Sequence, residues 1–161
     1  METALTLEFA DGTYAFDLKL PQIIELQEKC GTVGPDGTRQ RKGIFSIYSS
    51  IMAGRALVAD GVHIGVPDQA EAAVQEVYET IRLALIGGGE AIVNGETVRV
   101  SPLDAKRLVE TYVHPMPLSA AWDMAAAIHY ARVVGYQPKK KEVTPETESA
   151  AETATDSQTP A

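Results

Sequence analysis

The spacing of the hydrophobic residues changes once along this chain, and that change constrains the fold class. Between residues 5 and 18 large apolar side chains alternate with small or polar residues, the two-residue period of a strand with one buried face. Asp11-Gly12 interrupts the alternation and predicts a β-hairpin turn. After residue 20 apolar residues mostly recur at helical spacing. We therefore expect a single α+β domain, mainly helical, with an N-terminal hairpin.

Local start and stop signals place three helices in the first part of the chain. Pro21 occupies the first position of a short helix that ends before Gly31 and should cover the hairpin. A buried helix is expected over residues 44–59, because isoleucines recur there at helical spacing. Asp68 should cap the clearest amphipathic helix, which ends at the glycines of 87–89.

Residues 31–43 are rich in glycine and polar side chains and are expected to form a solvated loop. Arg39, Arg41 and Lys42 lie in this loop. Three charges make no extended field, so a basic docking patch is the weaker interpretation of this segment.

The second half of the chain carries equally local signals. Asn94-Gly95 between short apolar runs predicts a second, small hairpin. Ser101-Pro102 resembles a helix cap with proline at the first helical position, and the prolines of 114–117 end that helix.

The last predicted helix, 118–134, is apolar nearly all round. Such a helix is either central to the core or reserves one face for a partner. Its many alanines would let another helix approach closely by either route. If one face binds a partner, the expected anchors are Trp122, Met124 and Ile128, because large apolar groups dominate interface energetics.

Charge and cysteine content restrict the compartment and the partners. The net charge of −8 argues against general nucleic-acid binding, and no apolar run approaches the roughly 20 residues of a membrane span. Cys30 is the only cysteine, which suits a reducing compartment. We expect a cytoplasmic protein with one domain over residues 1–137 and a disordered acidic tail, rich in Thr and Ala, over 138–161.

The residues that could carry chemistry are better explained structurally. The glycines of 87–89 follow a helix and lack the lysine of a phosphate loop. The carboxylates Glu71, Glu76 and Glu79 fit a solvated helix face. His129, on an apolar helix, fits a hydrogen-bonded interior residue, and no histidine has a metal-ligand partner at helical spacing. The sequence predicts no cofactor, no metal site and no enzyme.

Several short sequence segments, taken in their order along the chain, resemble the gene transfer agent family of phage tail proteins, described as tail assembly chaperones. The segments are LTLEFADGTYAFDL at the start, IIELQEKCG, IRLALIGGG at 81–89, LVETYV, and HPMPLSAAWDMAAAIHYARVVGY at the end of the domain. Together they span most of residues 5–136. The family has no invariant catalytic motif, so the resemblance implies a role and transfers no site residue.

That role is phage tail assembly inside the bacterial host. The resemblance implies binding to the tape measure protein, which is kept soluble while tail tube subunits polymerise, and absence from the finished particle. Binding to the tail tube protein and self-association are further interactions that the sequence leaves open. The main alternative is a structural tail component, a tube or terminator subunit retained in the particle. A small cytoplasmic enzyme is the third hypothesis for the function.

Overall fold

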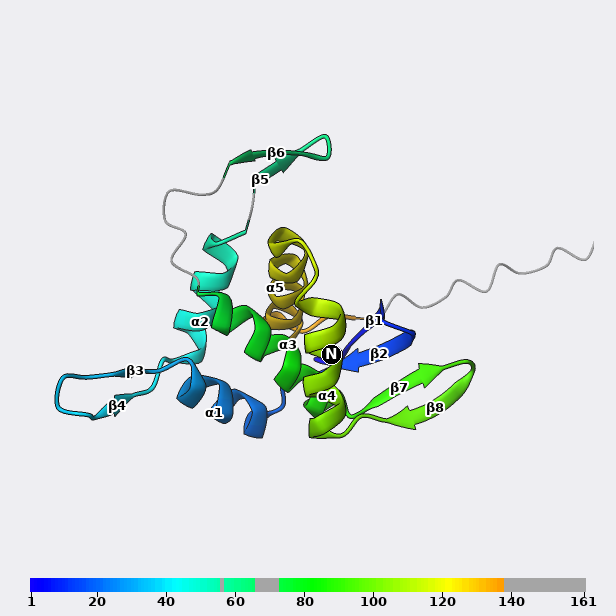
Figure 1. The fold of residues 1–161 in the computed structure, drawn as a ribbon, viewed down its shortest axis with the longest axis horizontal. Coiled ribbons are helices and arrows are strands. Elements are labelled where there is room, and N and C mark those ends of the chain that lie inside the picture. Colours follow the sequence, from blue (N-terminus) through cyan, green and yellow to red (C-terminus); the bar gives the residue numbers. More distant parts are fainter. Residues whose placement is uncertain (56, 66–72, 138–161) are drawn as a thin grey trace, which may run out of the picture.

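The computed structural model describes residues 1–55, 57–65 and 73–137, and these residues form an α+β fold. Figure 1 shows α3 near the middle, with the other helices around it and strands β1, β2, β7 and β8 together at one side. The helices are α1 (Leu20–Lys29), α2 (Ile44–Ala53), α3 (Val74–Gly88), α4 (Pro102–Leu108), the π-helix η1 (Val109–Val113) and α5 (Leu118–Val134).

One antiparallel sheet, with the strand order β1-β2-β7-β8, contains both predicted hairpins. Its strands are β1 (Leu5–Phe9), β2 (Gly12–Phe16), β7 (Glu90–Val93) and β8 (Glu96–Arg99). The hairpins join where Thr13 pairs with Ile92 and Tyr14 with Ala91. Sequence alone gave no sign of this pairing, because it links segments far apart in the chain.

The two hairpin turns differ in how well the sequence located them. Asn94 and Gly95 have φ of 52° and 78°, which confirms the predicted Asn-Gly turn. In the first hairpin Phe9 pairs with Gly12, so the turn is Ala10-Asp11 and the prediction of Asp11-Gly12 was wrong by one residue. Gly12 instead lies in β2, where a Cβ atom would collide with the carbonyl oxygen of Ile92.

Helix α3 packs against the sheet through its last turn. A Cβ atom on Gly87 would overlap the carbonyl oxygen of Asp17, and one on Gly88 would overlap that of Ala15. Gly89 then ends the helix in the left-handed conformation, with φ of 69°, as predicted for this glycine run. The first two glycines thus provide close approach and the third provides the cap.

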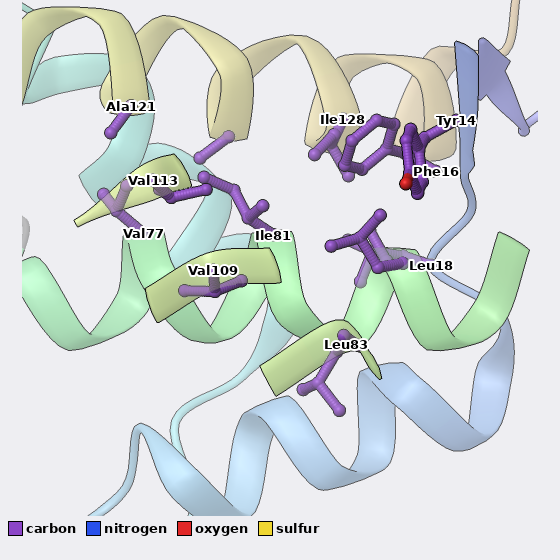
Figure 2. Close-up of a cluster of buried hydrophobic side chains, with 14 of the residues drawn as sticks. Tyr14, Phe16, Leu18, Val77, Ile81, Leu83, Val109, Val113, Ala121 and Ile128 are labelled. Carbon is purple, nitrogen blue, oxygen red and sulfur yellow. The ribbon is translucent and has the colours of Figure 1, made fainter. Parts of the chain in front are cut away.

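Buried apolar side chains of the described residues gather in one cluster between the helices and the inner face of the sheet. In Figure 2, Phe16 of β2, Ile81 of α3 and Ile128 of α5 lie in the layer between α3 and α5. All three side chains are at most 1% exposed. Burying side chains of this size contributes roughly 1.5–3 kcal/mol each.

Helix α2 is shorter than the predicted 44–59. It ends at Ala53 with Gly54 as its cap, and a hairpin of β5 (Leu57–Ala59) and β6 (Val62–Gly65) follows. Asp60 and Gly61 both have positive φ at its turn, 51° and 75°. This Asp-Gly pair is itself a strong hairpin signal. In Figure 1 the β5–β6 hairpin extends away from the helices.

The segment 31–43 also departs from the predicted loop. It contains a small hairpin of β3 (Thr32–Val33) and β4 (Arg39–Gln40) that projects from the helices (Figure 1). Arg41 lies 3.1 Å from a carboxylate oxygen of Glu28, and Lys42 forms an ion pair with Glu76. Two of its three basic side chains are thus paired with carboxylates, which weakens the docking-patch interpretation further.

The predicted starts of two helices are confirmed by the structure. Pro21 lies in the first turn of α1, and Ser101 and Asp104 form the capping box of α4, with Asp104 N to Ser101 Oγ at 3.1 Å. The Asp68 cap and the acidic tail, 138–161, lie outside the described residues. Among the helices described, none is long and apolar enough to span a membrane.

Candidate interaction surface

The three predicted partner anchors on α5 contribute to the core of the chain itself. Ile128 is 1% exposed and Trp122 9% exposed, and half-buried Met124 packs against the same cluster. In this arrangement Trp122 and Ile128 hold α5 against the rest of the molecule and present little surface to a partner. The sequence reveals that these residues are large and apolar, but it does not reveal which side of the helix the core occupies.

A different part of α5 is open and apolar. A groove of about 440 Å³ runs between α5, α2 and the start of β1. It is lined by Leu5, Met52, Arg55, Asp123, Ala126, Ala127, Tyr130, Ala131 and Tyr136. Ala126 and Ala131 are each 3% exposed and form its floor, whereas Ala127 is exposed and Tyr130 is half exposed.

The small side chains of α5 make this groove. Alanine at 126, 127 and 131 leaves the helix backbone close to the surface, where a bulkier residue would fill the space. The groove therefore leaves space for another helix to lie close to the backbone of α5. An apolar channel of this kind suits the apolar face of an amphipathic helix.

Polar contacts border the groove on two sides. Arg55 Nε donates to Asp123 Oδ1 at 3.0 Å and links the end of α2 to α5. The Tyr136 hydroxyl donates to the carbonyl oxygen of Ala4, and Glu2 and Tyr136 exchange two backbone hydrogen bonds of 3.0 Å. An apolar centre with a polar rim is the ordinary anatomy of a protein interface.

His129 lies on the opposite, buried side of α5, as predicted. Its Nε2 is 2.9 Å from Thr80 Oγ1, and the Thr80 hydroxyl donates its only hydrogen to the carbonyl oxygen of Glu76 at 2.6 Å. Thr80 must therefore accept from His129, so Nε2 carries the ring hydrogen and Nδ1 does not. Nδ1 has no partner within the described residues, and burial lowers the pKa of His129 to about 4.

Glu76 corrects the prediction of a solvated carboxylate face on α3. It is 3% exposed, pairs with Lys42, and accepts from the backbone N–H of Ala73 at 2.8 Å through Oε2. Lys42 Nζ also donates to Ser50 Oγ at 3.2 Å. The carboxylate therefore joins the start of α3 to the segment before α2. Half-buried Glu79 pairs with Arg82 at 2.6 Å, and Glu71 lies outside the described residues.

The other candidate reactive groups have structural surroundings. Cys30 is half-buried against the core, and burial raises the pKa of its thiol to about 12, far from the range of a reactive thiolate. His114 lies edge-on against Tyr78, with ring centroids 5.1 Å apart. Within residues 1–55, 57–65 and 73–137, no group of three His, Cys, Asp or Glu side chains is arranged to hold a metal ion.

Comparison with known proteins adds no relative from which a site could be transferred. No protein-family model, curated protein or solved structure matches this chain. The groove beside α5 is therefore identified as a candidate interaction surface from its geometry alone.

Proposed function

We propose that this chain is a non-enzymatic tail assembly chaperone of a tailed phage or gene transfer agent. It acts in the bacterial host cell, where it binds an apolar helical segment of the tape measure protein and keeps that protein soluble while the tail tube assembles. The observation that carries the proposal is the open apolar groove beside α5, bounded by polar contacts. The resemblance of the ordered sequence segments to tail assembly chaperones supplies the partner.

The groove matches the physical problem such a chaperone solves. A long helical protein exposes apolar surface before its tube encloses it, and exposed apolar surface promotes aggregation. Ala126 and Ala131 form a shallow apolar floor, and Tyr130 adds an aromatic ring with a polar tip at the edge. A helix lying there would bury its apolar face and leave its polar face in water.

The alternative is a structural tail component retained in the particle. Tube subunits usually depend on large β-sheets, whereas helices dominate this fold and its one larger sheet has four short strands. That balance favours the chaperone.

Co-expression with the tape measure protein encoded nearby tests the proposal. We expect a soluble complex, seen by size-exclusion chromatography, that forms only when both chains are present. Ala127→Glu should weaken the complex about 100-fold, because leaving a charge unpaired in an apolar interface costs about 3 kcal/mol. Ala127 is exposed in the free chain, so the substitution should leave the fold of the chain unchanged.

Ala120→Glu is the matched control. Ala120 is equally an exposed alanine of α5, but it does not line the groove. Equal loss of binding in both variants would remove the groove from the proposal. If the tape measure protein stays insoluble and this chain is found in purified particles, the structural-component function replaces the chaperone function.

A further inference from the structure

The outward side of α5 carries a regular line of exposed residues. Ala120, Asp123, Ala127, Tyr130 and Val134 are all exposed and follow one another at steps of three and four positions. This spacing places them on one line along the helix, away from the side that packs on α3. We call this line the α5 seam. Three of its members also line the groove beside α5.

The α5 seam contains one charged side chain, and that charge is compensated within the chain. Arg55 Nε donates to Asp123 Oδ1 at 3.0 Å. Within the described residues, neither Asp123 Oδ2 nor the Tyr130 hydroxyl makes a hydrogen bond. The seam therefore offers a free acceptor and a free donor. It also presents little net charge, although the chain as a whole carries −8.

The α5 seam is complementary to itself when a second copy lies antiparallel across it. Val134 and Ala120 each lie seven positions from Ala127. A two-fold axis beside Ala127 therefore brings Val134 of each copy over Ala120 of the other, so that a larger side chain meets a small one. The same axis brings Tyr130 beside Asp123 of the other copy, where the hydroxyl can donate to the free carboxylate oxygen.

A parallel pair of α5 helices would be less complementary. It would place Val134 on Val134 and Ala120 on Ala120, so that the large residues set the separation and the small ones lose contact. It would also align the two helix dipoles, which favour antiparallel neighbours. Size and polarity along the seam thus select the antiparallel arrangement.

The length of the α5 seam limits the strength of this pairing. Ala120 and Val134 are separated by about 21 Å of helix. Stable interfaces use about 20–30 residues a side, several times more than the seam supplies. The paired state is therefore in ready exchange with single chains, and a competing helix can displace it.

We propose that two copies of this chain pair antiparallel through their α5 seams, with the two-fold axis beside Ala127, and so cover the groove of each copy. The dimer does not depend on the proposed function, because it follows from the seam alone. Its displacement by a helix of the tape measure protein rests on the proposed function, because both would occupy the groove beside α5.

Sedimentation equilibrium of the full-length chain tests the pairing. We expect the average mass to rise from 17.3 kDa toward twice that value between about 10 μM and about 1 mM, the range of weak association. Ala127→Glu should raise the dissociation constant about 10-fold or more, because two unpaired carboxylates would meet at the axis. Leu103→Glu is the matched control. It adds the same charge at an exposed apolar residue of α4, outside the seam, and should leave the dissociation constant unchanged.

Disulfide formation tests the register. In a Cys30→Ala background, Ala127→Cys should form an intermolecular disulfide on mild oxidation. Ala120→Cys alone and Val134→Cys alone should not, because the two copies of either position would lie about 21 Å apart and a disulfide requires Cα atoms within about 7 Å. A mixture of these two variants should cross-link.

Three results would overturn the proposal. They are a mass of one chain at every concentration, equal dissociation constants for Ala127→Glu and the unsubstituted chain, and self-cross-linking of Ala120→Cys as efficient as that of the mixture. The chaperone function is judged separately. A monomeric chain that keeps the tape measure protein soluble would retain that function and reject the dimer, and a dimer that forms no such complex would do the reverse.

Discussion

At the scale of single residues, His129 shows how burial sets a chemical property. The ring is fully buried between α3 and α5, and its one hydrogen bond among the described residues is to Thr80. Adding a proton to Nδ1 would create a buried charge and a donor without a partner. The neutral form is therefore favoured in the folded chain, and the histidine acts as a structural group of the core.

The depressed pKa of His129 predicts loss of stability in mild acid. The unfolded chain takes up this proton near pH 6.5 and the folded chain near pH 4, so below pH 6.5 protons favour unfolding. The free energy of unfolding should fall by on the order of 3 kcal/mol from this group between pH 7 and pH 4. Urea denaturation across this range measures the loss.

The control for this prediction is His129→Gln, which keeps a donor for Thr80 but does not titrate. Its free energy of unfolding should depend less on pH over the same window, whatever its value at pH 7. An NMR titration of the His129 ring gives the pKa directly. A pKa near 6.5 in the folded chain would contradict the burial argument.

At the scale of elements, the contact between α3 and β2 is set by glycine. Two consecutive glycines let the last turn of the helix lie against the β2 segment, where carbonyl oxygens occupy the space of the missing side chains. This close contact between α3 and the β2 segment also allows the backbone N–H of Asp17 to donate to the carbonyl oxygen of Ala84 at 2.9 Å. The helix end and the sheet are therefore joined by backbone contacts.

Gly88→Ala should loosen this junction. The added methyl group would overlap the carbonyl oxygen of Ala15, and overpacking of this kind costs about 1–3 kcal/mol or more. The midpoint of thermal unfolding, followed by circular dichroism, should fall by several degrees. Gly43→Ala is the matched control, because Gly43 has φ of −63° and no atom within 4 Å of the added carbon. Equal effects of the two changes would refute the close-approach argument.

At the scale of the whole molecule, stability is unevenly distributed. Helix α3 contacts α1, α4, α5 and β2, and its residues from Thr80 to Leu85 are largely buried. The β3–β4 hairpin, in contrast, projects from the body, and all four of its strand residues are exposed (Figure 1). Opening that hairpin exposes little apolar surface, whereas opening α3 disrupts the core.

Amide hydrogen exchange should reproduce this contrast. The slowest amides are expected in the middle of α3 and should exchange only through global unfolding, and those of Thr32–Val33 and Arg39–Gln40 should exchange fastest among the strands. Mass spectrometry of exchanged peptides measures both. Protection of the β3–β4 hairpin equal to that of α3 would show that this hairpin is covered in solution.

Local chemistry in the sequence was sufficient for several elements. The period of the apolar residues gave the α+β class, the Asn94-Gly95 turn gave the second hairpin, and Ser101-Pro102 gave the start of α4. The bounds of α5 also follow from the sequence, because Pro117 and Gly135 flank its apolar run. These features depend on residues within a few positions of one another, which is why they can be predicted.

Tertiary structure alone decided the features that depend on distant segments. The joining of the hairpins through β2 and β7, the burial of Glu76 beside Lys42, and the side of α5 that faces the core all require contacts between remote parts of the chain. The predicted anchors on α5 illustrate the reason. The sequence shows that the helix carries both large and small apolar side chains. Only packing against α3 determines that Trp122 and Ile128 face the core and that Ala127 stays exposed.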